Sequence, residues 1–369
     1  MVERTCPDGV WDGFRHRQSW ADRGSSERQG KGIMISPRHL LYSLLFAVSI
    51  LVIAGCSPDG GALDPRGPGA ADIAAHWWVM FWLGLIVFVV VVILLLFAIL
   101  RARRTGDPDR RPPISDRTFF IVAGLAIPSL ILAVVLGDSV RTGQALITPP
   151  EEPALTIEVI GHQYWWEVRY PDHDVVTANE IHLPAGEPVE LRLTSADVIH
   201  SFWVPELTGK RDLNPGKENL MWIQANEEDI YWGQCAEFCG VQHALMGKLI
   251  VAQSPTEFEE WIAARQEPAA EPVDERLQAG MEIYFDAGCA MCHGIDGITE
   301  PSPAGAPGPD LTHFGSRMTI GSGIEDNTRG NLAAWIIDPH EIKPGVRMPP
   351  TDLDADELEA LVEFLHSLE

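Results

Sequence analysis

Basic residues are scarce in this chain of 369 residues, which has 27 lysines and arginines against 52 aspartates and glutamates. The formal net charge is therefore −25. Nucleic-acid binding relies on basic patches that neutralise phosphates, so this balance excludes a nucleic-acid partner. The acidic balance fits an exported domain and a basic protein partner.

Cysteines are also few, with six in the chain. Four of them form two close pairs, Cys235 with Cys239 and Cys289 with Cys292. Such close spacings suit a metal or a haem better than a disulfide that closes a loop. If both pairs hold cofactors, no cysteines remain for a structural disulfide framework.

The N-terminal region is polar and rich in arginine until Met34, which opens a secretory signal pattern: a short basic region, the 15 apolar residues 40–54, then Gly55 and Cys56. We predict a leader and signal peptide over residues 1–55, with the true start near Met34. The ending IAGC resembles a bacterial lipoprotein processing site, which predicts a lipid on Cys56. An uncleaved or differently cleaved signal is the alternative.

Long apolar runs occur twice more. Residues 77–100 contain 24 residues without a charge, and residues 119–137 contain 19, so both can cross a bilayer. The connecting sequence RARRTGDPDRRPPISDR holds six arginines, which the positive-inside rule places in the cytoplasm. We predict a two-helix membrane hairpin over 76–138 in a bacterial inner membrane, with the rest of the chain on the outer, periplasmic face. Buried helices of a soluble protein are the alternative.

The stretch 150–262 is predicted to be an all-β domain. ALTIEVIGHQYWWEVRYP and PVELRLTSADVIHSFWVP alternate apolar and polar residues, and the turn signals PDHD, PAGE and NPGK punctuate the region. Short strands with such punctuation indicate a sandwich or a Greek-key barrel.

The segment CAEFCGVQHALM, residues 235–246, supplies two cysteines, a histidine and a methionine. Thiolate and thioether ligands favour copper, and imidazole suits it as well. His200, at the start of a predicted strand, would add a second histidine. A mononuclear blue copper site needs one cysteine, so the second favours two coppers bridged by two thiolates. Zinc held by two cysteines and two histidines is the alternative.

With these motifs, residues 75–255 resemble subunit II of bacterial cytochrome c oxidases, whose cupredoxin-like domain carries the binuclear copper centre CuA. The resemblance implies a set of side-chain ligands and one backbone carbonyl: His200, Cys235, Cys239, His243 and Met246, and the carbonyl of Glu237. It also implies that the Glu237 carboxylate helps to hold a magnesium ion at the border with subunit I.

Two departures from the family pattern stand out. The family usually has a tryptophan directly after GHQ as the electron-entry residue, whereas GHQYWW places Tyr164 there and Trp165 next. Electron entry is therefore assigned to Tyr164 and Trp165, with packing in a strand core as the alternative. The family's glutamate before the proline of the second helix is also absent from FFIVAGLAIP, so proton uptake would use other groups.

After a linker rich in proline, alanine and glutamate at 263–275, the motif CAMCH begins at Cys289 and follows an amphipathic helix pattern. This spacing predicts covalent haem c on Cys289 and Cys292, with His293 as an iron ligand. A redox CxxC pair or half of a zinc site is the alternative.

Residues 276–369 resemble a small all-α bacterial cytochrome c of the class I type. Met348 in KPGVRMPP is the predicted sixth iron ligand, and Met318 is the second candidate. The segment GPDL, which begins at Gly308, matches a family loop whose proline carbonyl often meets the proximal histidine.

A CuA domain with a tethered cytochrome c resembles the caa-type oxidases, in which the tether provides a high effective concentration. The resemblance implies an electron-transfer subunit II with subunits I and III as partners. Electrons would pass from a quinol–cytochrome c reductase or a cytochrome c to haem c, then to CuA, then to haem a in subunit I, for oxygen reduction coupled to proton translocation. The oxygen-reducing site lies in another chain, because two membrane helices cannot supply its histidines.

Other classes of function remain open. One is a freestanding membrane-tethered electron-transfer protein that serves another terminal reductase, and another is a copper-delivery or copper-storage module. A quinol-oxidase subunit II is excluded, because that relative lacks the copper ligands.

Several polar residues outside the motifs receive simpler predictions. His162, beside the aromatic cluster, is expected to be structural, and Asp197 is placed to hydrogen-bond near the copper ligands or to lie on a proton or electron path. Five further histidines are expected at the surface or in loops: His173, His182, His313, His340 and His366.

Overall fold

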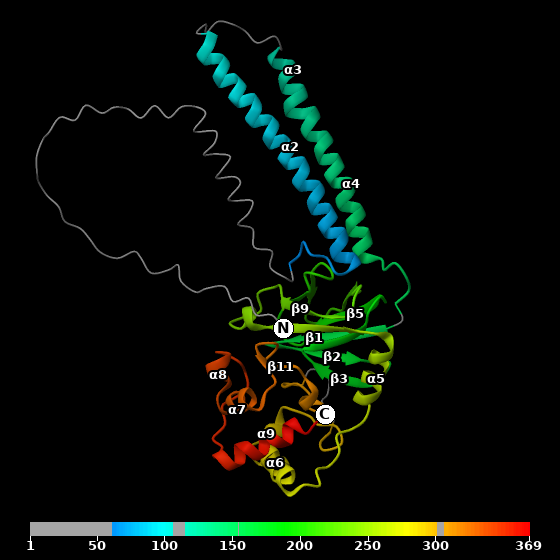
Figure 1. The fold of residues 1–369 in the computed structure, drawn as a ribbon, viewed down its shortest axis with the longest axis vertical. Coiled ribbons are helices and arrows are strands. Elements are labelled where there is room, and N and C mark those ends of the chain that lie inside the picture. The colour runs from blue at the N-terminus through cyan, green and yellow to red at the C-terminus, as the bar shows by residue number, and fades with distance from the viewer. Residues whose placement is uncertain (1–60, 106–114, 154, 301–305) are drawn as a thin grey trace, which may run out of the picture. The chain divides into compact units, whose positions relative to one another are not determined.

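The computed structural model describes residues 61–105, 115–153, 155–300 and 306–369 (Figure 1). The predicted leader, signal peptide and lipid-bearing Cys56 lie outside these residues. The described helices are α2 (Pro68–Thr105), α3 (Asp116–Ile121), the π turn η1 (Val122–Ala126), α4 (Ile127–Ile147), the 3-10 turn η2 (His243–Leu245), α5 (Pro255–Arg265), α6 (Glu275–Asp286), the 3-10 turns η3 (Cys289–Met291) and η4 (Phe314–Ser316), α7 (Arg329–Ile337), α8 (Pro339–Ile342) and α9 (Ala355–His366).

The described strands are β1 (Leu155–His162), β2 (Trp165–Tyr170), β3 (Val175–Ala178), β4 (Glu180–Pro184), β5 (Val189–Ser195), β6 (His200–Trp203), β7 (Arg211–Leu213), β8 (Asn219–Ile223), β9 (Asp229–Cys235), β10 (Gly247–Gln253), β11 (Thr319–Ile320) and β12 (Glu325–Asp326).

Two helical runs form the predicted hairpin, α2 on one side and α3, η1 and α4 on the other (Figure 1). Both are long and apolar enough to cross a membrane. The π turn η1 lies directly before the helix that carries Pro128 near its start. Such a turn adjusts the backbone where proline cannot donate a hydrogen bond.

The helices extend beyond both ends of the predicted hairpin, 76–138. Helix α2 begins at Pro68, and α4 ends at Ile147. The extra turns are held by hydrogen bonds to the β domain: Ala70 N donates to Leu207 O at 3.0 Å, and Trp222 Nε1 donates to Ala145 O at 3.2 Å. A charge-free apolar run marks the part of a helix that can lie in lipid, and it does not report helical turns that are stabilised by a soluble domain.

The β domain contains two five-stranded sheets, ordered β3-β2-β1-β5-β8 and β4-β10-β9-β6-β7. Strand β1 runs parallel to β5, and β10 runs parallel to β4, whereas the other neighbours are antiparallel. In β5 every second residue is buried, as the alternating sequence predicts. The chain crosses between two mixed sheets, as in the predicted cupredoxin-like sandwich.

The C-terminal part is helical, with α6 and α9 packed against each other around a separate apolar core that includes Tyr284, Leu332 and Phe364. Gly280 of α6 faces the backbone of Ala360 in α9, where a Cβ atom would collide with the carbonyl. A glycine therefore permits this close helix crossing. Helix α5 continues to Arg265, so the irregular segment before α6 is 266–274 rather than the predicted 263–275.

Candidate copper and haem centres

Three strand ends bring the copper motif together. His200 begins β6, Cys235 ends β9, and Gly247, which follows Met246, begins β10. Strand β6 pairs with β9 so that Phe202 lies opposite Cys235, and β9 pairs with β10. The intervening loop can therefore carry Cys239 and His243 back over the same end of the sheet.

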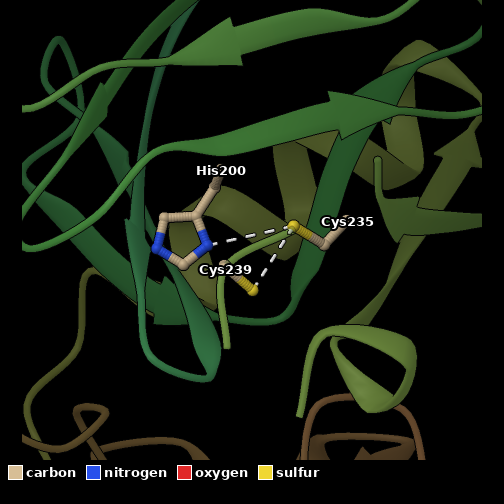
Figure 2. A group of neighbouring side chains, drawn as sticks. All are labelled: His200, Cys235 and Cys239. Carbon is tan, nitrogen blue, oxygen red and sulfur yellow. Dashed lines mark hydrogen bonds between the residues drawn. The ribbon is translucent and has the colours of Figure 1, made fainter. Parts of the chain in front are cut away.

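The donor atoms of this motif form a compact group. Cys235 Sγ lies 3.9 Å from His200 Nδ1 and 3.8 Å from Cys239 Sγ. Cys239 Sγ lies 3.8 Å from His243 Nδ1 and 3.9 Å from Met246 Sδ. Cys235 Sγ also lies 3.3 Å from the backbone oxygen of Glu237. Figure 2 shows the imidazole of His200 turned toward the two sulfur atoms.

These distances exclude a disulfide between Cys235 and Cys239, and both thiols are free and buried. Two soft sulfurs, a thioether, two imidazoles and a carbonyl are a donor set that fits copper. The residues present therefore fit the binuclear centre that the sequence suggests.

The two thiols titrate as a pair. The hydrogen bond between them lowers the pKa of Cys235 and raises the pKa of Cys239. The first thiolate therefore forms readily, whereas the second is costly without a bound cation. Metal binding requires both thiols in their deprotonated form, so a metal ion would drive the second deprotonation.

Asp197 holds His200 from the side opposite the sulfurs. Its Oδ1 lies 2.9 Å from His200 Nε2, which confirms the predicted hydrogen bond near the copper ligands. Burial opposes protonation of His200, but the hydrogen bonds from Asp197 and Cys235 outweigh it and raise the pKa of His200. Because Asp197 engages Nε2, the other ring nitrogen is directed at the sulfurs.

We expect Asp197→Ala to lower copper affinity on the order of 10- to 100-fold, because loss of an outer partner frees the ring of a ligating histidine. Asp197→Asn retains an acceptor oxygen and should lose less. Copper retained during dialysis of the membrane complex against graded chelator concentrations measures the effect. Asp212→Ala, at an exposed aspartate of β7, is the matched control. Equal retention in all three variants would contradict the assignment.

Lys248 is a residue that sequence reasoning missed. It is fully buried, its Nζ donates to Gln234 O at 2.9 Å, and it lies 4.1 Å from the ring centroid of Trp166. Burial lowers its pKa to about 7. A lysine in a strand ordinarily faces water, so the sequence pattern of β10 does not indicate that Lys248 is buried inside the copper domain.

The haem motif lies where α6 ends. Gly288 adopts a positive φ of 76°, which lets the chain turn into η3 with Cys289 half-buried and Cys292 exposed. His293 follows, and its Nδ1 lies 2.8 Å from Pro309 O, as the GPDL segment predicts. Burial lowers the pKa of His293, so its ring is neutral and its other nitrogen can bind iron.

Gly308 provides a second test of fit. A Cβ at this position would lie 2.7 Å from His293 Cε1, so only glycine allows the loop to lie against the ring. Tyr284 Oη donates to His293 O at 2.6 Å, which fixes the backbone of the same residue. The residues therefore fit a haem that would be held by both cysteines and by the Nε2 atom of His293.

The predicted sixth ligand lies in the loop between α8 and α9. Met348 and the second candidate, Met318, are both half-buried, so burial does not separate them. The backbone amide of Met318 donates to Glu180 Oε1 at 2.8 Å, so this residue already anchors a contact with β4. Met348 stays the predicted ligand.

The predicted electron-entry residues lie at the turn between β1 and β2. Tyr164 and Trp165 are each 9% exposed, and Trp165 stacks on His162 with ring centroids 4.2 Å apart. Tyr164 Oη accepts a hydrogen bond from Val241 N of the copper loop at 3.2 Å. His162 is buried against Glu167, as expected of a structural histidine.

One of the histidine predictions is wrong. His182 is buried, stacks on Trp261 of α5, and its Nδ1 lies 2.9 Å from Gln253 Oε1. His313 lies in the turn before η4, as predicted, but it is also buried, with its ring nitrogens 3.1 Å from Glu369 O and 3.2 Å from Arg265 O. Both lie beneath segments that are distant in sequence, which local patterning cannot report.

Comparison with known proteins agrees with this geometry. The family model described as cytochrome c oxidase subunit II, periplasmic domain, matches residues 174–254, and the cytochrome c family model matches residues 277–369. Cytochrome c oxidase subunit 2 of Alkalihalophilus pseudofirmus is 33% identical, over 86% of this chain and 94% of that protein. The Bacillus subtilis protein of the same description is 30% identical, over 90% of this chain and 98% of that protein.

Among solved structures, the periplasmic domain of subunit II of cytochrome oxidase from Bradyrhizobium japonicum is 30% identical, with a TM-score of 0.31, over 31% of this chain and 96% of that one. The two curated relatives carry the assignment, because their similarity extends over 86% and 90% of this chain and over nearly all of their own length. The chain therefore belongs to the cytochrome c oxidase subunit II family, in the form that combines a CuA domain with a fused cytochrome c domain.

Proposed function

We propose that this electron-transfer subunit receives electrons at its covalent haem c and passes them through a binuclear copper centre to haem a of subunit I. The observation that carries the proposal is the donor group around Cys239, with two unpaired thiols 3.8 Å apart. The proposed copper ligands are His200, Cys235, the carbonyl of Glu237, Cys239, His243 and Met246.

When bound, the two groups supply reversible one-electron oxidation and reduction. The chain's own residues hold them in fixed positions: Asp197 orients His200, and Pro309 O orients His293. Both centres lie in domains with well-packed apolar cores, which limits rearrangement of the protein as the charge changes. Control therefore comes from ligand identity, hydrogen bonding and burial rather than from acid–base chemistry.

The membrane placement follows from the two apolar helices and the arginines between them. We propose a bacterial inner-membrane hairpin with the copper and cytochrome domains on the periplasmic face, beside subunits I and III. The donor would be a quinol–cytochrome c reductase or a cytochrome c. The exposed Glu237 carboxylate is proposed to contribute to a magnesium site at the border with subunit I.

Purification of the membrane complex tests the function. We expect co-purification with a polytopic haem–copper subunit, a seven-line mixed-valence copper signal in electron paramagnetic resonance, and a chain mass increased by one covalent haem. Covalent haem with a mononuclear copper or a zinc signal would contradict the CuA assignment. Isolation without a haem–copper subunit would favour a freestanding electron-transfer protein.

The sixth haem ligand is tested by a pair of variants. Met348→Leu should remove the thioether ligand and lower the haem potential by tenths of a volt, within the range of about 0.8 V that axial ligands control. Met318→Leu is the matched control and should leave the potential unchanged. Redox titration of the haem absorbance measures both. The opposite pattern would transfer the ligand role to Met318.

A further inference from the structure

The cytochrome domain contacts the copper domain through hydrogen bonds that reach the copper loop. Glu180 Oε1 of β4 accepts from the backbone amides of Met318 and Thr319 at 2.8 and 3.0 Å. Gly247 N donates to Ser322 O at 3.0 Å, and Ser322 Oγ donates to Gly247 O at 2.7 Å. Gly247 directly follows the proposed copper ligand Met246.

Lys343 lies in this contact and is almost completely buried, with 1% of its surface exposed. Its Nζ donates to Tyr164 O in the copper domain at 3.0 Å and to Gly321 O in the cytochrome domain at 2.8 Å. A buried amine is costly unless it is hydrogen-bonded, and here the partners come from both domains. Burial also lowers the pKa of Lys343 to about 7. The side chain therefore joins the two domains at one point.

The segment that Lys343 contacts also supports the copper loop. Gln163 Nε2 donates to Cys239 O at 2.6 Å, and Tyr164 Oη accepts from Val241 N at 3.2 Å. Gln163 and Tyr164 thus touch the copper loop on one side and the cytochrome domain on the other.

Arg347 adds a second contact from the same cytochrome loop. It hydrogen-bonds to Gln163 Oε1, and its Nη1 lies 3.9 Å from Asp197 Oδ2. Its side chain is 62% exposed, so water screens this contact, and we expect the buried Lys343 to dominate.

We infer that Lys343 is a positioning residue for electron transfer within the chain: it fixes the cytochrome c domain on the Gln163–Tyr164 segment and so sets the distance and orientation between the haem and the copper loop. The inference rests on the proposed function. It also gives the predicted electron-entry residues a donor, since the chain's own cytochrome domain contacts the backbone of Tyr164 through Lys343. Tethering alone would supply proximity, whereas Lys343 supplies a defined orientation.

The test uses the complete membrane complex with Lys343→Met, which keeps the length of the side chain and removes its donors. We expect the rate of electron transfer from haem c to copper, measured after rapid photoreduction of the haem, to fall at least about tenfold, because a misplacement of about 1 Å can cost on the order of 100-fold. Hydrogen exchange of the amides of Met318, Thr319 and Gly247 should accelerate on the order of tenfold. The copper and haem spectra should be unchanged.

Lys217→Met, at an exposed lysine in the turn between β7 and β8, is the matched control and should change neither readout. Lys343→Arg retains donors and should restore part of the rate. If Lys343→Met does not accumulate, Lys343→Leu, which also lacks donors, serves the same comparison. An unchanged transfer rate with unchanged exchange would overturn the inference. Absence of the copper or haem signals from the unmodified complex would instead contradict the proposed function.

Discussion

Replacing Cys239 with serine is expected to abolish the binuclear copper signal and to reduce oxidase activity more than about 100-fold. Loss of a residue that only hydrogen-bonds to a metal ligand already lowers metal affinity or activity about 10- to 100-fold, and loss of a ligand should lower it further. Cys239 Sγ lies at the centre of the site, within 3.9 Å of donor atoms from Cys235, His243 and Met246. A serine hydroxyl is a hard, protonated donor and cannot bridge two coppers as a thiolate does. Copper content per chain and electron paramagnetic resonance measure the first effect, and oxygen consumption measures the second.

A hydroxyl placed beside the site, without loss of a ligand, is the appropriate control. Ala236→Ser lies in the same loop, one residue after Cys235, and its amide already donates to Ser201 O at 3.0 Å. This variant should keep copper and activity. The ligand assignment would fail if Cys239→Ser retained two coppers per chain with an unaltered mixed-valence signal.

The copper loop was predictable because its proposed ligands lie within twelve residues and their chemistry is distinctive. The alternation of apolar residues in β5 and the charge-free runs of the hairpin were predictable for a similar reason: each pattern is local, and one environment dictates it. His200 could also be assigned, since it begins a strand with clear alternation. Spacing and periodicity were sufficient for these features.

Features that depend on contacts between distant segments were not predictable. Every residue of β4 is buried, although the sequence EIHLP contains a glutamate and a histidine. Glu180 accepts amides from the cytochrome domain, and His182 stacks on Trp261 of α5, so the face expected to meet water is covered. Lys343 belongs to the same class. A charged residue gives no sign in the sequence that it will be buried at a contact between domains.

We expect the double variant Cys289→Ala and Cys292→Ala, which removes both proposed haem-attaching cysteines, to abolish covalent haem. Oxygen consumption supported by cytochrome c should fall on the order of 100-fold or more, because loss of the positioning of two reacting groups has an effect of that size. Thioether bonds from these two cysteines would tie the haem to the turn that also carries His293. Chain mass and haem-linked absorbance under denaturing conditions measure attachment. The copper signal should persist, because the apolar core around Cys235 and Cys239 is distinct from the core of the cytochrome domain.

Met291→Ala is the matched control for the double variant, because Met291 lies between the two cysteines and its side chain is 81% exposed. It should keep covalent haem and activity. In the double variant, a small-molecule reductant that reaches the copper directly should restore reduction of the copper and oxygen consumption, which would place the haem upstream of the copper. Undiminished activity with cytochrome c would mean that electrons enter at the copper domain from outside. The contact between Lys343 and the backbone oxygen of Tyr164 argues against such entry, since an external donor that used this segment would have to displace the chain's own cytochrome domain.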